Sequence, residues 1–183
     1  RIVHSNPDQV VVIDEAYVDF GGESAVPLTR QYDNLLVVQT FSKSRSMAGA
    51  RLGFAIGPKG LIADLNKLKY STNPYNLNRL TQLAGVAALR EQSYYDENCR
   101  RIMETRQYTR YTLTALGFTC TDSQANFLLA RTDAMDGETL YRKLKDRGIL
   151  VRHFSDPLIT DWVRITIGSR EQMEKLVAVV KEL

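Results

Sequence analysis

A short segment of the sequence places one amine, two hydroxyls and one guanidinium close together. Lys43 follows Thr40 by three residues and Ser42 by one, and Arg51 comes eight residues after Lys43. A lysine can attack a carbonyl carbon when its amine is neutral, while hydroxyls and an arginine at a fixed offset suit a phosphate group. This combination indicates a site for pyridoxal 5'-phosphate (PLP), a cofactor that carries both an aldehyde and a phosphate.

A carboxylate and a phenol stand upstream, after an apolar run. Asp14 follows Val11, Val12 and Ile13 directly, and Tyr17 comes three residues later. The pyridine nitrogen of PLP needs a carboxylate that keeps it protonated, and the ring hydroxyl needs a donor. Taken singly, each of these residues is more simply explained as a strand end, a turn or a surface charge. The prediction therefore depends on their combination.

Open α/β sheets place catalytic groups at the carboxyl ends of their strands, so strands are expected before both motifs. The β-branched run at residues 10–13 predicts a strand that is buried on both faces. A second buried strand is expected over residues 35–40, where it would deliver the loop that carries Lys43. Residues 51–57 predict a third strand, and a short helix should follow through residue 69.

Two further helices are expected in the middle of the chain. In the first, over residues 77–90, five apolar residues fall on one face: Leu80, Leu83, Ala84, Ala87 and Ala88. The second is a long, half-exposed connector over residues 94–116, which Gly117 should end. Since no linker composition marks a domain boundary, the helices place it near residue 92.

The remaining pattern predicts a compact α+β module. Strands are expected at residues 126–130, 149–152 and 163–167, and helices at residues 137–147 and 170–183.

Composition excludes several classes of protein. The 183 residues are 44% hydrophobic and 25% charged, and the net charge of +3 comes from interspersed Lys, Arg, Asp and Glu. No basic surface for nucleic acid or membrane is therefore expected. Two cysteines without C-x-x-C spacing and two histidines predict no disulfide framework and no metal site. A reducing cytoplasm is the expected compartment.

Several separated motifs, in this order, resemble the fold-type I PLP-dependent aminotransferases, and within them the histidinol-phosphate aminotransferase family. They comprise Asp14 with Tyr17, the segment from Thr40 to Arg51, and the run Val163-Arg164-Ile165-Thr166-Ile167-Gly168. The resemblance covers essentially the whole chain. It implies an α/β fold, in which residues 1–92 form part of the PLP-binding large domain and residues 93–183 a small α+β C-terminal domain with a long connecting helix. Members are about twice as long, so the chain is expected to be a C-terminal half that is inactive alone.

The resemblance also implies roles for individual residues. Lys43 is the catalytic residue, which binds the cofactor covalently and then moves a proton. The other cofactor-binding residues are Asp14 at the pyridine nitrogen, Tyr17 at the ring oxygen, and Thr40, Ser42 and Arg51 at the phosphate. Substrate-binding residues are Arg164 for a carboxylate, Arg152 for a substrate phosphate, and Asn126. From its position alone, Asn126 is equally well explained as capping its own backbone.

The implied activity is transamination of histidinol phosphate with 2-oxoglutarate, a step of histidine biosynthesis, by a cytoplasmic homodimer. An aromatic or broad-range aminotransferase, a threonine-phosphate decarboxylase and an inactive C-terminal fragment remain alternatives. One segment departs from the family pattern, because Ser44-Arg45-Ser46-Met47 replaces the usual small and aromatic residues after the lysine.

Overall fold

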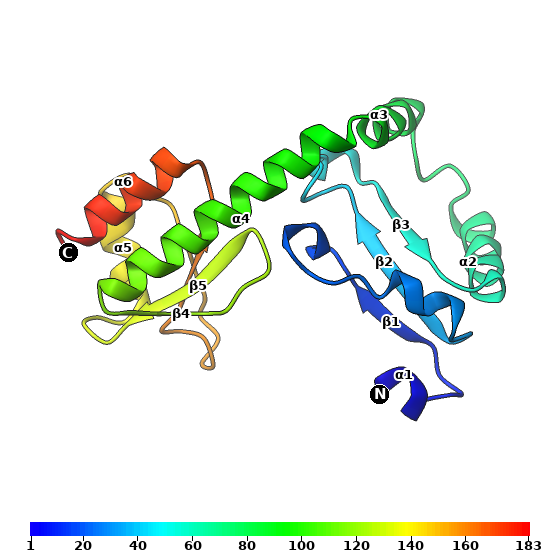
Figure 1. Cartoon of the computed structure of the whole chain (residues 1–183), viewed down its shortest axis with the longest axis horizontal. Helices are drawn as coiled ribbons and strands as arrows, with labels where there is room; N and C mark the ends of the chain where they lie inside the picture. Colours follow the sequence, from blue (N-terminus) through cyan, green and yellow to red (C-terminus); the bar gives the residue numbers. More distant parts are fainter. The chain divides into compact units, whose positions relative to one another are not determined.

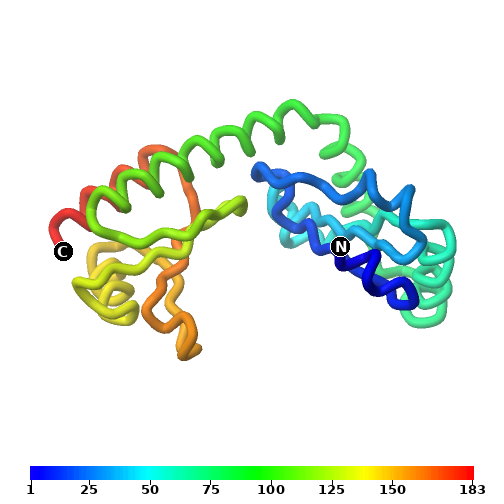
Figure 2. The backbone as a smooth tube through the Cα atoms, turned by 60° about the horizontal axis from the view of Figure 1, so that its bottom comes forward, coloured from blue at the N-terminus to red at the C-terminus, as the bar shows by residue number.

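The computed structural model describes all 183 residues. They divide into two compact units, Arg1–Asp96 and Glu97–Leu183 (Figures 1 and 2). The boundary expected near residue 92 lies at the start of helix α4 (Gln92–Ala115), which continues from the first unit into the second. None of the helices combines the length and the apolar character needed to cross a lipid bilayer.

The first unit is built on a three-stranded sheet in the order β1-β2-β3. These strands are β1 (Val11–Asp14), β2 (Leu35–Thr40) and β3 (Gly53–Ile56). β1 runs parallel to β2, and β3 runs antiparallel to it. The first half of β2 is buried, with Leu35 and Val37 fully inaccessible, which confirms the expected buried strand.

The expectation that the first strand is buried on both faces is wrong. Residues along β1 alternate between half-buried and exposed, and the side chain of Val12 is 54% exposed. β1 is an edge strand, and in this chain only one of its faces is covered. β3 also begins two residues later than expected, because Arg51 adopts a left-handed backbone with φ of 54°.

Short helical segments precede or connect the strands of the first unit. They are α1 (Ile2–Ser5) and the 3-10 helices η1 (Val18–Phe20), η2 (Val26–Arg30) and η3 (Ala48–Ala50). Two longer helices follow the sheet, α2 (Lys59–Thr72) and α3 (Arg79–Arg90). The side chain of Asn78 caps α3 by accepting a hydrogen bond from the amide of Thr81, at 2.9 Å.

Of the five apolar residues that the sequence places on one face of α3, only Ala88 is buried. The buried residues of the helix are Thr81, Gly85 and Ala88, whereas Leu80 is 78% and Leu83 60% exposed. A Cβ atom at position 85 would lie 2.5 Å from a methyl carbon of Leu52. The helix therefore approaches the β3 segment through its small residues, since only they leave room for that side chain.

The second unit is an antiparallel sheet covered by helices. Its strands, in the order β4-β5-β7-β6, are β4 (Phe118–Cys120), β5 (Phe127–Thr132), β7 (Val163–Thr166) and β6 (Arg152–His153). Helices α5 (Gly137–Asp146) and α6 (Arg170–Val180) complete the unit. The sequence did not predict β4. The bounds expected for the next strand, residues 149–152, are wrong, because β6 begins only at Arg152 and ends at His153.

The core of the second unit contains fully buried leucine and valine side chains from helices and strands alike. They include Leu113, Leu128, Leu140, Val163 and Leu176. The only tryptophan of the chain, Trp162, lies just before β7, where the guanidinium carbon of Arg131 stands 5.6 Å from its ring.

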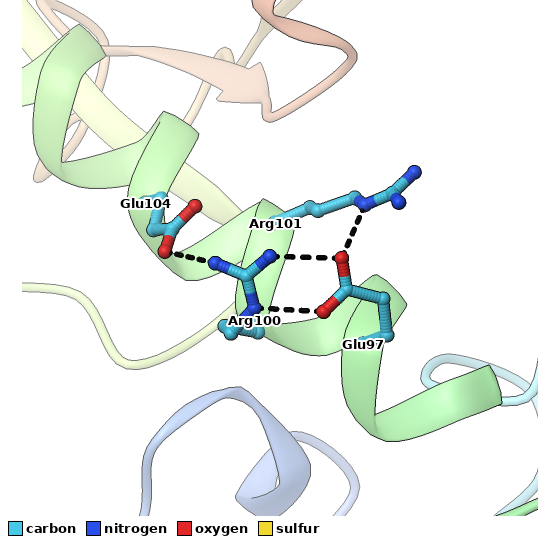
Figure 3. A network of polar contacts seen from close by, with 4 residues as sticks. All are labelled: Glu97, Arg100, Arg101 and Glu104. Carbon is cyan, nitrogen blue, oxygen red and sulfur yellow. Dashed lines mark hydrogen bonds and ion pairs between the residues drawn. The ribbon is translucent and has the colours of Figure 1, made fainter. Parts of the chain in front are cut away.

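Helix α4 carries a network of charged side chains on its exposed surface (Figure 3). Glu97 accepts hydrogen bonds from Nε of Arg100 and Nε of Arg101, each at 2.7 Å, and Arg100 also donates to Glu104. The two arginines hold the pKa of Glu97 down to about 2. Gly117, with φ of 86°, follows the helix as expected of a residue that ends one.

Candidate functional site

The two motifs of the first unit meet at one end of its sheet. β1 and β2 are parallel with Asp14 in register with Val38, so their carboxyl ends lie at the same edge. Asp14 is the last residue of β1, and Thr40 ends β2. The side chain of Asp14 is exposed, and its Oδ1 accepts a hydrogen bond from the amide of Ala16 at 2.9 Å. Its Oδ2 accepts none, so this oxygen is available to a ligand.

Lys43 extends from the loop after β2 toward the other member of the upstream motif. Its Nζ lies 5.2 Å from the centroid of the Tyr17 ring. The lysine side chain is exposed and forms no ion pair with a carboxylate. The fold therefore brings together an amine and a phenol that are 26 positions apart in the sequence, beside the carboxylate that ends β1.

Two hydroxyls and a guanidinium gather near the same strand end. Thr40 Oγ1 accepts a hydrogen bond from the amide of Ser42 at 3.0 Å and lies 3.4 Å from the carbonyl of Leu52. Thr40 also pairs with Gly53 of β3, so Arg51 lies close to the end of β2. Arg51 donates to the carbonyl of Ala48 at 3.0 Å and has no carboxylate partner. The positive charge of Arg51 is therefore available to bind an anion.

The loop that carries Lys43 is held by contacts of its own. Ser44 is buried and donates to the carboxylate of Asp19, which belongs to η1. Ser46 adopts a left-handed backbone with φ of 54°, and the next amide, that of Met47, donates back to Phe41 at 3.0 Å. The loop therefore turns back on itself at the end of β2.

Glu15 is a buried carboxylate to which the sequence analysis assigned no role. It is 7% exposed and accepts three hydrogen bonds, from the hydroxyl of Ser24 at 2.7 Å, the amide of Ala25 at 2.5 Å and the side chain of Gln39 at 2.8 Å. These bonds tie the end of β1 to β2 and to the loop before η2. Because neighbouring residues of a strand point to opposite sides, an exposed Asp14 could have indicated a buried Glu15.

Two arginines stand directly opposite each other in the second unit. Arg152 of β6 pairs in register with Arg164 of β7, so both side chains lie on one face of the sheet. Neither forms an ion pair, and the Nε atom of Arg164 is buried without a hydrogen-bond partner. Like charges placed opposite each other are unfavourable, which makes this pair suited to an anionic ligand.

Aromatic rings support both of these arginines. The guanidinium carbon of Arg164 lies 5.3 Å from the ring centroid of Phe127, and that of Arg152 lies 5.3 Å from the ring of Phe154. A planar guanidinium can stack on a ring while its N–H groups stay free to bind a carboxylate or phosphate.

Asn126 precedes β5 and has a fixed backbone. Its carbonyl accepts from the amide of Ile167 at 2.9 Å, and the neighbouring carbonyl of Ala125 accepts from Arg106 at 2.6 Å. Its side-chain amide makes no hydrogen bond to the backbone, so the explanation that Asn126 caps its own backbone is wrong. Ser123 has that role instead, because its hydroxyl accepts from the amide of Ala125 at 3.0 Å.

The expected site residues thus form two groups, one in each unit. The group in Arg1–Asp96 contains Asp14, Tyr17, Thr40, Ser42, Lys43 and Arg51, and the group in Glu97–Leu183 contains Asn126, Arg152 and Arg164. The first group can present an amine beside donors for a phosphate. The second can bind a further anion.

The chain is similar to known histidinol-phosphate aminotransferases. The histidinol-phosphate aminotransferase of Brachyspira hyodysenteriae is 49% identical over 182 residues, which are 99% of this chain and 51% of that protein. The chain therefore spans about half the length of the curated relatives that it matches.

Solved structures share the fold. The crystal structure of the histidinol-phosphate aminotransferase from Clostridium acetobutylicum superimposes with a TM-score of 0.89 at 27% identity, over 99% of this chain and 56% of that one. The enzyme of the same name from Sinorhizobium meliloti, solved in complex with PLP, gives a TM-score of 0.76 at 26% identity, over 94% of this chain and 49% of that one. These likenesses confirm the expected fold class. Since residues 2–180 also match the model of aminotransferase class I and II, the chain belongs to that family.

Proposed function

We propose that the protein is a PLP-dependent aminotransferase that converts histidinol phosphate and 2-oxoglutarate to imidazole acetol phosphate and glutamate. The observation that carries this proposal is the position of the Lys43 amine, 5.2 Å from the Tyr17 ring at the strand end that Asp14 also occupies. The names of the relatives support the choice of reaction and substrate. The assignment of residues 1–92 to a PLP-binding large domain and 93–183 to a small domain is part of the same proposal.

The side chains of the first group fit this cofactor. When bound, PLP supplies an electron sink that accepts the electrons released as a substrate Cα–H bond breaks. The free Oδ2 of Asp14 would bind the protonated pyridine nitrogen, and the phenol of Tyr17 would donate to the ring oxygen. The hydroxyls of Thr40 and Ser42 and the unpaired guanidinium of Arg51 would hold the phosphate.

Lys43 has two roles in this proposal. Its amine would hold the cofactor covalently, and in its free, neutral form it would serve as the general base that removes a substrate proton. A general base must reach the proton that it removes. The exposed, unpaired side chain of Lys43 allows that movement, while the hydrogen bonds of the neighbouring loop residues keep its backbone in place.

Arg152 and Arg164 would distinguish the substrates. We assign Arg164, whose buried Nε lacks a partner, to the carboxylate of glutamate and 2-oxoglutarate, and the more exposed Arg152 to the phosphate of histidinol phosphate. Asn126 lies in the same unit and has an unbonded side-chain amide, which would contact the bound substrate.

We further propose that the protein is a cytoplasmic homodimer, as the family resemblance implies. Large apolar side chains are exposed on α3 and in the preceding turn, such as Leu80 and Tyr75, and they support a partner subunit that covers them. Light scattering on the full-length protein measures the oligomeric state, and a monomer would contradict this part of the proposal.

Labelling of Lys43 tests the cofactor assignment. Full-length protein is loaded with PLP, treated with borohydride to fix the cofactor–lysine link, digested and mapped by mass spectrometry. We expect the label on Lys43 alone, and its loss in Lys43→Arg but not in Lys59→Arg, which changes an exposed lysine of α2. A label on another lysine of the loaded protein would refute the assignment.

Substitution of the paired arginines tests the substrate. Charge-assisted hydrogen bonds contribute about 1.5–3 kcal/mol, so losing one should lower kcat/KM by about ten- to a hundredfold. Arg152→Ala should impair the reaction with histidinol phosphate and spare the half-reaction with glutamate, while Arg164→Ala should impair glutamate at least as strongly. Arg147→Ala, which removes an exposed ion pair with Glu182, is the control.

The same assays separate the alternative activities. Equal losses for both substrates in Arg152→Ala would favour a broad-range aminotransferase. Release of carbon dioxide from threonine phosphate, without formation of an oxo acid, would identify a decarboxylase instead.

A further inference from the structure

Arg45 has the largest set of contacts in the loop that carries Lys43. Its Nη1 donates to the carbonyl of Ala88 at 3.2 Å, and its Nη2 donates to Oε1 of Gln92 at 2.6 Å. Its guanidinium carbon also lies 5.5 Å from the ring centroid of Phe41 and 5.3 Å from that of Tyr95. One side chain thus joins the end of β2 to the end of α3 and the start of α4, all within the first unit.

Only a guanidinium can make all of these contacts at the same time. Ala88 lies in the last turn of α3, where carbonyl groups lack a partner inside the helix and a positive charge is favourable. A planar guanidinium can stack on aromatic rings and donate two hydrogen bonds in its own plane at the same time. An ammonium group has no such plane, so lysine could satisfy only part of this set.

The helix side of this contact is itself held in place. Nε2 of Gln92 donates to the carboxylate of Asp96 at 2.6 Å, one turn further along α4. On the other side of the loop, Ser44 bonds to Asp19. The two residues after Lys43 are therefore bonded to different parts of the first unit, Ser44 to η1 and Arg45 to the helices. The side chain of Lys43 itself makes no hydrogen bond.

We propose that Arg45 is a positioning residue for Lys43. By fixing the loop to the junction of α3 and α4, it keeps the Lys43 backbone where the amine reaches the Tyr17 ring at 5.2 Å. This inference rests on the proposed function, because it takes Lys43 as the lysine that binds PLP. The proposal assigns a role to Arg45 in the segment Ser44-Arg45-Ser46-Met47, where this chain departs from the small and aromatic residues of the family pattern.

The test compares four variants of the full-length protein. Arg45→Ala removes the contact, Arg45→Lys keeps the charge without the plane, and Gln92→Ala removes one acceptor. Arg90→Ala is the matched control, since it removes a cation from the same last turn of α3 without touching the loop. Far-UV circular dichroism should show that all four are folded.

Two measurements are made on each variant. The first is hydrogen exchange of residues 43–47 without cofactor, where the amides of Ser46 and Met47 are bonded to Lys43 and Phe41. The second is the fraction of Lys43 that borohydride fixes to PLP at limiting cofactor, followed across pH together with the absorption spectrum of the bound cofactor.

Arg45→Ala should speed exchange in the loop by roughly tenfold or more and lower the labelled fraction of Lys43 by a similar factor, with a shifted pH profile. Arg45→Lys and Gln92→Ala should both lie between Arg45→Ala and the unsubstituted protein, and Arg90→Ala should match the unsubstituted protein.

The possible results separate this inference from the proposed function. Unchanged loop exchange in Arg45→Ala would overturn the inference. So would faster exchange with unaltered labelling and pH profile, because Arg45 would then stabilise the loop without positioning Lys43. Absence of label on Lys43 in the unsubstituted protein would overturn the proposed function, and the inference with it.

Discussion

Replacing Glu15 with glutamine should destabilise the first unit strongly, although the two side chains have the same shape. Oε2 of Glu15 accepts from Ser24 and Gln39, and Oε1 accepts from the amide of Ala25. A glutamine can keep its oxygen on the first two donors. Its NH2 group then faces the Ala25 N–H, so that bond is replaced by two opposed donors.

The size of the effect follows from this geometry. A hydrogen bond to a charged group contributes about 1.5–3 kcal/mol, and a buried donor left without an acceptor costs about 1–3 kcal/mol. A loss of about 3 kcal/mol is therefore expected in the free energy of unfolding of the first unit. Because 1.4 kcal/mol corresponds to a factor of ten, exchange of the most protected β2 amides should become roughly a hundredfold faster.

Hydrogen exchange of residues 35–40, followed by mass spectrometry, measures this change. Glu23→Gln is the control, because Glu23 belongs to the same loop region but is exposed and has no partner. It should alter the free energy by less than about 0.5 kcal/mol. A loss below about 1 kcal/mol in Glu15→Gln would show that the three bonds to Glu15 do not hold the strand ends together.

Three further predictions concern stability and reactivity. In Gly137→Ala the new Cβ would lie 2.4 Å from the carbonyl oxygen of Thr160, so thermal unfolding should show a clear loss of stability. Gly60→Ala has open space around the new Cβ and should instead raise the free energy of unfolding by roughly 0.5–1 kcal/mol. The pKa of Glu97 is lowered to about 2, so its ion pairs stabilise α4 fully above pH 4.5 and are lost as the pH falls through 2. An NMR titration of the Glu97 carboxyl group should therefore have its midpoint well below pH 4.5. Burial raises the pKa of the Cys120 thiol, so iodoacetamide should alkylate it more slowly than free cysteine near neutral pH, and an equal rate would contradict the burial.

The sequence was sufficient for the parts of the fold that depend on local pattern. The apolar run at residues 35–38 identified β2, and Gly117 marked the end of α4, because strand burial and left-handed helix ends leave signals within a few residues. Motif order indicated which residues end the strands, and the parallel pairing of β1 with β2 then brings Asp14 near the Lys43 loop.

Features that depend on contacts between distant segments could not be predicted. The buried face of α3 is decided by Leu52, which lies over Gly85 and excludes a larger side chain. The pairing of Arg152 with Arg164 depends on the path of the nine residues between β6 and β7, where no pattern specifies a register. The hydrogen bonds of Arg45 likewise join residues more than 40 positions apart.

The single tryptophan gives the second unit an optical reporter of its own. Trp162 packs against Arg131, whereas residues 1–96 contain tyrosine and phenylalanine but no tryptophan. An unfolding curve recorded by tryptophan fluorescence therefore follows residues 97–183, and exchange of the β2 amides follows the first unit. If the two curves coincide, the units unfold as one cooperative block. If they separate, each unit has its own transition, and one melting temperature would not describe the chain.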